Sequence, residues 1–307
     1  MNGILLIDKP AGMTSHDVVA AVRKLGRIKK VGHAGTLDPF ATGLLMLCLG
    51  KATKISQYLV GHDKTYVGVM KLGETTDTQD RTGEVIARQP TAAVSPEALT
   101  HALKQFEGPQ SQLPPMFSAK KVGGRRLYDL ARTGKTVERE PQAVTIYALD
   151  LLDVDWPFVR FRVACSKGTY IRTLAHDIGQ VLGCGAHLTA LQRTAIGPFA
   201  LSDAMSLDQF ARAVEQGEEE QCLIPLDTAL ACFPAISLPD QAATRLAHGT
   251  RVLLPAQVVE QVQQGEETAQ MMRVYRASGT FIALASMTIV HQNEETLCQF
   301  QPIKVLI

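Results

Sequence analysis

The interpretation of this chain starts from one stretch, Gly32-His33-Ala34-Gly35-Thr36-Leu37-Asp38-Pro39. Its glycines allow positive φ angles and a close approach of the backbone to a ligand. Pro39 fixes its own φ and favours an extended conformation for Asp38. A carboxylate held in this way is either a turn residue, the commoner role of Asp in such sequences, or a positioned nucleophile or base. The stretch alone leaves both readings open.

Length and composition describe a water-soluble globular protein. The chain has 307 residues, of which 46% are hydrophobic and 20% are charged, and this length favours two domains. No uninterrupted apolar run is long enough to span a bilayer. The N-terminus opens on the strand-like segment Gly3–Ile7, without a basic leader or a small-residue cleavage site. We therefore expect a cytoplasmic protein that is neither exported nor membrane-bound.

The sequence lacks the signatures of several common sites. Six cysteines are scattered and none forms a Cys-x-x-Cys pair, which argues against a zinc site or a disulfide framework. Gly43 and Gly50 stand two residues too far apart for a Walker A loop, and no Gly-x-Gly-x-x-Gly follows a strand. Ser15-His16-Asp17 has the letters of a triad, but adjacent side chains do not converge as a triad requires. We expect no metal and no cofactor.

Basic residues gather in two parts of the chain although the net charge is only +1. Residues 1–60 hold eight basic and three acidic residues, and residues 118–139 hold seven basic and two acidic residues. Local basic patches can bind phosphates without a basic total. A solvated charged face accounts for each patch equally well.

Hydrophobic periodicity and cap residues predict the elements of the first domain. The expected strands are Gly3–Ile7, Thr65–Leu72, Ala143–Val154, Phe158–Cys165 and Leu188–Thr194. The expected helices are Ser15–Leu25, Pro96–Phe106, Leu127–Arg132 and Thr169–Leu182. We also expect a hairpin-like partner for Thr65–Leu72 near Gly83–Ala87, and a C′ glycine at Gly26.

The C-terminal part has a different pattern. Short strand-like runs alternate with Gly or Pro breaks, at Val252–Leu254, Met271–Tyr275, Phe281–Leu284 and Ile303–Ile307. This pattern suits a small β-barrel. Residues 237–307 carry five basic and six acidic residues, so their charge gives no sign of RNA binding.

Two further side chains stand out beside Asp38. Tyr66 follows Lys64-Thr65 at the start of an expected strand, and Arg172 lies in the first turn of a helix that follows Cys165–Tyr170. Tyr66 could simply pack in the core, and Arg172 could simply be a surface residue of the helix. The alternative for both residues is a place in an active site.

Six segments stand in the order found in one known family. They are Asp8–Asp17, Gly32–Pro39, Lys64–Tyr66, Gly73–Thr78, Gln112–Lys120 and Cys165–Arg172. On these segments the chain closely resembles the bacterial TruB family of tRNA pseudouridine synthases. One such segment is a weak signal, whereas six in order form a highly specific one.

The resemblance implies an α+β fold with a mixed, largely antiparallel central sheet flanked by helices, the pseudouridine synthase fold. It implies a catalytic domain over residues 1–234 with a basic RNA-binding insertion at about 110–141. A small, β-barrel-like, reduced PUA domain is implied over residues 235–307.

The resemblance also implies the activity and its catalytic residues. The family isomerises uridine 55 in the T-loop of tRNA to pseudouridine, without net redox change. Asp38 matches the catalytic aspartate, and Arg172 matches the arginine paired with it, which we expect to lower the pKa of Asp38. Tyr66 matches the tyrosine that stacks on the target base. Which atom Asp38 attacks stays open.

Other matching residues are implied to bind RNA. The target base must be flipped out of the folded loop, and His33 matches the residue inserted beside the vacated place. Tyr170 and Leu191 match the lining of the uracil pocket, and Lys9 matches a residue that supports the active site. Basic residues of the insertion complete the expected RNA-binding set, namely Lys120, Arg125, Arg126 and Arg132.

The expected partner is tRNA, through its T-loop and T-stem, and we expect a monomer with no obligate protein partner. One alternative is a tRNA-folding chaperone whose catalysis is secondary or absent. Another is a guide-RNA-dependent synthase that relies on partner proteins. Intact Asp38, Tyr66 and Arg172 favour the enzyme, and the basic insertion favours a self-sufficient one.

Overall fold

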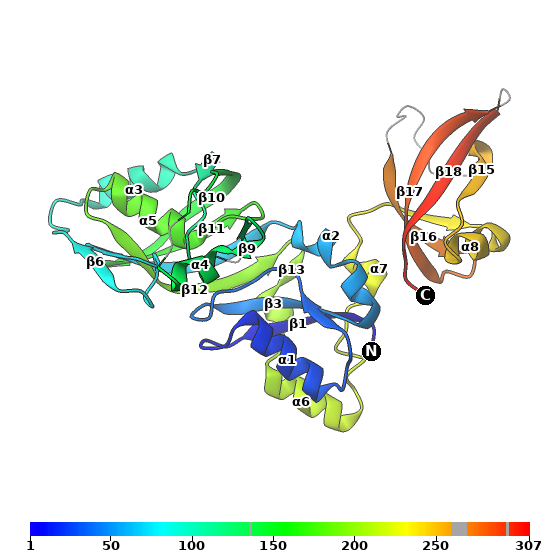
Figure 1. The fold of residues 1–307 in the computed structure, drawn as a ribbon, viewed down its shortest axis with the longest axis horizontal. Coiled ribbons are helices and arrows are strands. Elements are labelled where there is room, and N and C mark those ends of the chain that lie inside the picture. Colours follow the sequence, from blue (N-terminus) through cyan, green and yellow to red (C-terminus); the bar gives the residue numbers. More distant parts are fainter. Residues whose placement is uncertain (119, 135–136, 259–268, 293–294) are drawn as a thin grey trace.

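The computed structural model describes residues 1–118, 120–134, 137–258, 269–292 and 295–307, together with all their side chains except those of Lys121, Arg126, Arg132 and Val258. Figure 1 shows a larger body built on one sheet and a smaller C-terminal body at the far end from β6 and α3. Among the described residues, no helix is long and apolar enough to cross a membrane.

The larger sheet is mixed and mostly antiparallel. Its strands are β1 (Gly3–Lys9), β2 (Val31–His33), β3 (Thr42–Leu49), β4 (Lys64–Leu72), β7 (Gly108–Gln112), β10 (Gln142–Asp155), β11 (Phe158–Cys165), β12 (Ala186–Ile196) and β13 (Phe199–Ala200). The main path runs β1-β3-β12-β4-β11-β10-β7, and only the β3–β12 pair on it is parallel. The predicted α+β class with a largely antiparallel sheet is confirmed.

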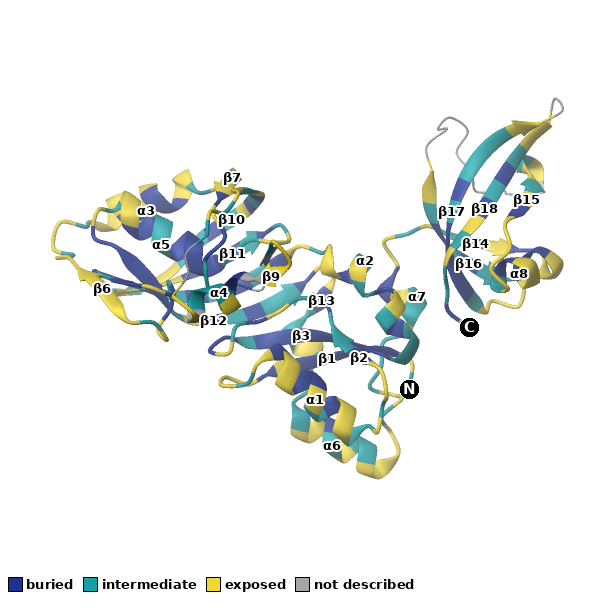
Figure 2. Ribbon diagram, viewed as in Figure 1, coloured by how far each residue is buried: buried dark blue, intermediate teal, exposed yellow. Residues whose placement is uncertain are grey.

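Helices cover both faces of the larger sheet. They are α1 (Ser15–Leu25), α2 (Ser56–Val60), α3 (Pro96–Gln105), α4 (Leu127–Arg132), α5 (Ile171–Val181), α6 (Leu207–Gln216) and α7 (Leu226–Ala229), with 3₁₀ turns η1 (Gly50–Lys54) and η2 (Leu201–Asp203). Residues of α1, α5 and α6 share one core with inward residues of the strands. Residues of η1, α2 and α7 pack on the other face of β1 and β3. These two strands are therefore buried on both faces, as Figure 2 shows.

Cap residues explain where the predicted helices begin. The Thr14 hydroxyl accepts from the Asp17 N–H and the Asp17 carboxylate accepts from the Thr14 N–H, a capping box that opens α1. At α3 the cap is a single bond, in which the Ser95 hydroxyl accepts from the Ala98 N–H. The predicted C′ role of Gly26 is wrong, because Gly26 keeps a right-handed conformation (φ −79°) and the left-handed turn falls on Arg27 (φ 51°).

The predicted partner of the strand at 65–72 is also wrong. β4 pairs with β11 and β12, whereas β6 (Val85–Arg88) forms a separate ribbon with β5 (Glu74–Thr76). All four residues of β6 are exposed, so its apolar side chains Val85 and Ile86 lie outside the core of the larger body. Another two-stranded ribbon, β8 (Lys121–Val122) with β9 (Arg125–Arg126), lies in the predicted insertion.

The C-terminal body has its own sheet and core. Its elements are β14 (Ala235–Leu238), α8 (Asp240–Ala247), β15 (Val252–Pro255), η3 (Ala256–Val258), β16 (Gln270–Arg276), β17 (Phe281–Gln292) and β18 (Glu295–Val305), with strand order β14-β16-β17-β18-β15. The sequence prediction missed α8. Lys54 Nζ donates to the Val305 carbonyl at 2.9 Å, and Leu284 and Leu306 join the core of the larger body. The two bodies are thus in direct contact.

Candidate active site

The two halves of the larger sheet meet at a narrow junction. β3 and β12 pair only through Thr42 with Gln192 and Gly43 with Arg193. Gly43 has φ 97°, and a Cβ there would collide with backbone atoms of Arg193. Glycine is therefore required for this close approach.

The turn that carries Asp38 is held in place by side chains from neighbouring elements. The Ser15 hydroxyl bonds to both the N–H and the carbonyl of Leu37. Arg193 donates to the carbonyls of Gly35 and Thr36, at 3.1 and 3.4 Å. Gly35 has φ 120°, whereas Gly32 lies in β2 without a positive φ. The two roles left open by the sequence are therefore compatible: the segment forms a turn, and this turn holds the Asp38 carboxylate in place.

Lys9 supports the same turn from behind. Its side chain is fully buried, and Nζ donates to the carbonyls of Pro10 and Met13 at 2.8 and 2.7 Å and of Pro39 at 3.4 Å. Burial lowers the pKa of Lys9 to about 8, although the nearby Asp38 acts in the opposite direction. The lysine therefore joins two loops and does not reach the cavities described below.

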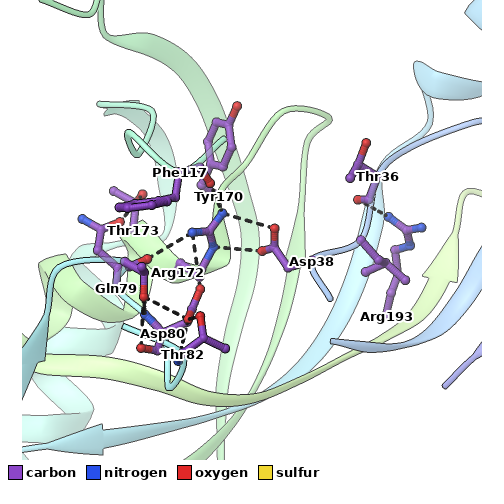
Figure 3. A network of polar contacts seen from close by, with 12 residues as sticks. Thr36, Asp38, Gln79, Asp80, Thr82, Phe117, Tyr170, Arg172, Thr173 and Arg193 are labelled. Carbon is purple, nitrogen blue, oxygen red and sulfur yellow. Dashed lines mark hydrogen bonds and ion pairs between the residues drawn. The ribbon is translucent and has the colours of Figure 1, made fainter. Parts of the chain in front are cut away.

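Arg172 forms a two-pronged ion pair with Asp38. Nε lies 2.8 Å from Asp38 Oδ2, and Nη2 donates to Oδ1 at 3.2 Å. Arg172 is only 4% exposed, whereas the Asp38 side chain retains 32% of its surface. Figure 3 shows the guanidinium facing the carboxylate edge to edge. The pair has the planar geometry that fixes a carboxylate most strongly.

Other acceptors fix the guanidinium itself. Nη1 donates to the Thr78 carbonyl at 3.0 Å and lies 3.4 Å from Asp80 Oδ2. Nη2 donates to the Phe117 carbonyl at 2.7 Å. Arg172 is therefore a buried part of the site, and the surface interpretation of this residue is wrong.

The pKa of Asp38 is raised above its ordinary value, contrary to the expectation from the Arg172 pair. Burial is the main cause, and the neighbouring Asp80 acts in the same direction. Arg172 and Lys9 favour the charged form and oppose the rise. The ion pair thus limits an increase that burial would otherwise make larger.

A cavity of about 420 Å³ opens beside Asp38. Tyr66 on β4, Tyr170 before α5, and Leu191 on β12 line it together with Asp38 and Arg172. A cavity of this size is ample for a nucleobase. The structure therefore brings five of the predicted residues to one place.

Tyr66 and Arg193 lie together in the wall of this cavity. Both are buried, and Arg193 Nε also donates to the Leu44 carbonyl at 2.8 Å. Burial raises the pKa of Tyr66, although the Arg193 guanidinium hydrogen-bonded to its hydroxyl acts in the opposite direction. The phenol is accordingly protonated at neutral pH.

Tyr170 is held through its backbone. The Gln112 side chain accepts from the Tyr170 N–H at 2.7 Å and donates to its carbonyl at 2.9 Å. Tyr170 itself is half-buried and lines the cavity. β7, which carries Gln112, thus positions the entry to α5.

A second cavity of about 760 Å³ lies on the other side of Asp38 and includes His33. The His33 ring packs edge to face against His16, with centroids 5.2 Å apart. Burial, with His16 and Arg193 nearby, lowers the pKa of His33 to about 4. The ring is therefore uncharged at neutral pH.

The basic side chains of the predicted insertion that the structure describes line neither cavity, and their contact with RNA stays a prediction. Lys120 and Arg125 line neither cavity, and Arg125 is exposed. The side chains of Arg126 and Arg132 lie outside the described residues. Ser118, by contrast, lines both cavities, so the start of the insertion adjoins Asp38.

Sequence reasoning missed Arg193, Asp80 and the Phe117 carbonyl as parts of the site. A charged residue in the middle of a strand was the available signal for Arg193. Asp80 lies two residues after the end of the Gly73–Thr78 segment. In the part of the chain that is described, no three His, Cys, Asp or Glu side chains form a possible metal-binding group.

Family models match most of the larger body. Residues 23–171 match the model of the TruB family pseudouridylate synthase N-terminal domain. Residues 172–231 match the model of the tRNA pseudouridylate synthase B C-terminal domain. The two matches are contiguous and include Asp38, Tyr66 and Arg172.

Curated relatives and solved structures extend the similarity. A tRNA pseudouridine synthase B of Burkholderia lata is 48% identical over 91% of this chain and 84% of its own length. That of Dechloromonas aromatica is 49% identical over 83% of this chain and 85% of its own length. A solved Cbf5-Nop10-Gar1 complex contains a chain with TM-score 0.75 and 28% identity, which covers 99% of this chain and 85% of its own. From these similarities, the chain belongs to the TruB family.

Proposed function

We propose that this protein isomerises uridine 55 in the T-loop of tRNA to pseudouridine. The observation that carries the proposal is the Asp38 carboxylate, which is paired with Arg172 and partly exposed in the walls of two cavities. The relatives named tRNA pseudouridine synthase B support the substrate.

The cavities suit a base that has left the helical stack. We propose that the flipped uracil enters the smaller cavity, between Tyr66 and Leu191, with Tyr170 at its rim. His33 then fills the place that the base has left. Because the His33 ring is uncharged, it can stack among bases without bringing a charge into the loop.

The reaction breaks the N1–C1′ bond of the nucleoside and forms a C5–C1′ bond. The C5 proton is lost and N1 gains a proton, so no oxidant or reductant is consumed. We propose that Asp38 acts in its ionised form, with Arg172 fixing its orientation. Tyr66 then packs on the base, and its raised pKa makes it a poor base at neutral pH.

We propose that the RNA phosphates lie along a basic surface formed by Lys24, Arg27, Lys29, Lys30 and Lys51. None of these side chains forms an ion pair with another described residue. β2 connects Lys30 to His33, and Lys54 of the adjoining η1 contacts the C-terminal body. This surface thus extends from the active site toward residues 235–307.

The remaining assignments belong to the same proposal. We infer that residues 1–234 perform catalysis, that Lys120, Arg125, Arg126 and Arg132 contact RNA, and that residues 235–307 assist binding. We also infer a cytoplasmic monomer that works without an obligate protein partner.

The position and self-sufficiency of the activity are tested together. The purified chain alone is incubated with a tRNA transcript, and pseudouridine is mapped by carbodiimide modification and reverse transcription. The proposal predicts one new stop at the T-loop uridine and none in a transcript with cytidine at that position. Binding without a stop would instead support the chaperone alternative, and a stop elsewhere would refute the assigned position.

A further inference from the structure

Gln79 adopts a left-handed backbone conformation, with φ 62°. This conformation is unfavourable for a residue with a Cβ, and it is rare outside Gly, Asn and Asp. It persists only where the surrounding structure fixes it, and such positions cluster at functional sites.

Two different elements fix Gln79. Its carbonyl accepts from the Leu188 N–H of β12 at 3.0 Å, and its side-chain oxygen accepts from the Thr173 hydroxyl of α5 at 3.0 Å. Its own N–H donates to the Thr76 carbonyl at 3.2 Å. Figure 3 shows Gln79 and Thr173 on the side of Arg172 that faces away from Asp38.

The residues that flank Gln79 both bind the same nitrogen of Arg172. The Thr78 carbonyl before it and the Asp80 carboxylate after it are the acceptors around Nη1. Asp80 is 4% exposed, and its other oxygen accepts from the Thr78 hydroxyl and the Thr82 N–H. The sharp turn at Gln79 lets a peptide oxygen and a carboxylate two positions apart converge.

We propose that Gln79, through its left-handed backbone, is a positioning residue for Arg172 and thereby for Asp38. The inference rests on the proposed function. With Nη1 held on this side, Nε and Nη2 face the Asp38 carboxylate. The charged groups around Asp38 are Arg172, Asp80 and Lys9. If Arg172 is misplaced, it opposes burial and Asp80 less effectively, and the pKa of Asp38 rises further.

The test compares substitutions that differ mainly in their tolerance of positive φ. Gln79→Gly tolerates the positive φ but loses the side-chain bond to Thr173. Compared with this glycine variant, Gln79→Ala adds only a Cβ, and Gln79→Val adds a β-branched side chain. Thr173→Val removes the side-chain bond while Gln79 stays. Single-turnover tritium release from tRNA labelled at uracil C5 is measured against pH, with tRNA affinity measured separately.

The proposal predicts that the single-turnover rate falls in the order Gly, Ala, Val, with Gly within about threefold of the wild type and Val lower by about tenfold or more. The acid limb of the pH profile moves to higher pH in the same order, while tRNA affinity changes little. Thr173→Val gives a smaller effect in the same direction. If Gln79→Val does not fold, the comparison of Ala with Gly still measures the backbone effect.

Equal rates and pH profiles for Gly, Ala and wild type, or Gly as low as Ala, would overturn the inference. A wild type that releases no tritium would instead remove the proposed function. The wild-type arm therefore distinguishes the two failures.

Discussion

At the scale of single residues, Asp38 is subject to two opposing influences. Burial and Asp80 raise its pKa, while Arg172 and Lys9 favour its charged form. If Asp38 acts in its ionised form, as we propose, catalysis depends on Arg172 for electrostatics as well as for orientation. We then expect this dependence to set the lower end of the pH range in which the enzyme works.

Replacing Arg172 by methionine removes the largest influence that lowers the pKa of Asp38. We expect the acid limb of the single-turnover rate to move to higher pH. At any pH below the pKa of Asp38, raising that pKa by one unit lowers the ionised fraction of Asp38 about tenfold. Part of the lost rate should return as the pH rises. An unchanged acid limb would contradict this electrostatic role.

Lys9 gives a pH-dependent stability. Its pKa is about 8 in the folded protein against 10.5 as the ordinary value, so above pH 8 the unfolded chain holds more protons at this residue. The free energy of unfolding of the wild type should therefore rise relative to Lys9→Met by about 1.4 kcal/mol per pH unit between pH 8 and 10.5. Urea denaturation at several pH values measures the difference. Parallel curves would show that Lys9 keeps an ordinary pKa.

Sequence reasoning at this scale found Asp38, Tyr66 and Arg172 through the family resemblance. It missed Arg193 because nothing in the spacing shows that a strand arginine turns inward to three carbonyls. It also predicted a lowered pKa for Asp38, because the ion partner is visible in the sequence and the burial is not.

At the scale of elements, the site depends on how β3 and β12 approach each other. Helices with strong cap residues, such as α1 and α3, were predictable because their signals are local. The pairing of β6 and the existence of α8 were not predictable. Strand partners are set by long-range contacts, and α8 begins after Pro239 without a side-chain cap.

The junction can be tested by a matched pair of glycine substitutions. Gly43→Ala meets a positive φ and a collision with Arg193, whereas Gly108→Ala meets a positive φ (91°) with no atom within 4 Å. We expect Gly43→Ala to be destabilised further than Gly108→Ala, by on the order of 2 kcal/mol. Chemical denaturation measures the difference. Equal losses of stability in the two variants would show that β3 and β12 can move apart at Gly43 without a cost in free energy.

At the scale of the whole molecule, a chain with a net charge of only +1 gathers basic residues on one surface, which we propose binds RNA. We expect tRNA affinity to fall steeply with salt, because each phosphate that the protein neutralises makes the slope of log affinity against log salt more negative by roughly 0.7 to 0.9. Charge reversal at Lys30 and Lys51 should weaken tRNA binding and make the dependence of affinity on salt less steep. Lys104→Glu, exposed on α3, is the matched control and should change neither.

Binding measurements at several salt concentrations decide this point. A flat salt response in the wild type would refute the basic surface of Lys24, Arg27, Lys29, Lys30 and Lys51. An equal effect of Lys104→Glu would show that net charge matters and its location does not. Composition alone could not predict this surface, because the fold brings residues 24–30 beside residue 51.

The central claim is that Asp38, paired with Arg172, performs the isomerisation. The most direct test is single-turnover release of tritium from tRNA labelled at uracil C5, by the wild type and by Asp38→Asn, with tRNA affinity measured for both. We predict release by the wild type and none by Asp38→Asn at unchanged affinity. Release by Asp38→Asn at the wild-type rate would contradict the claim.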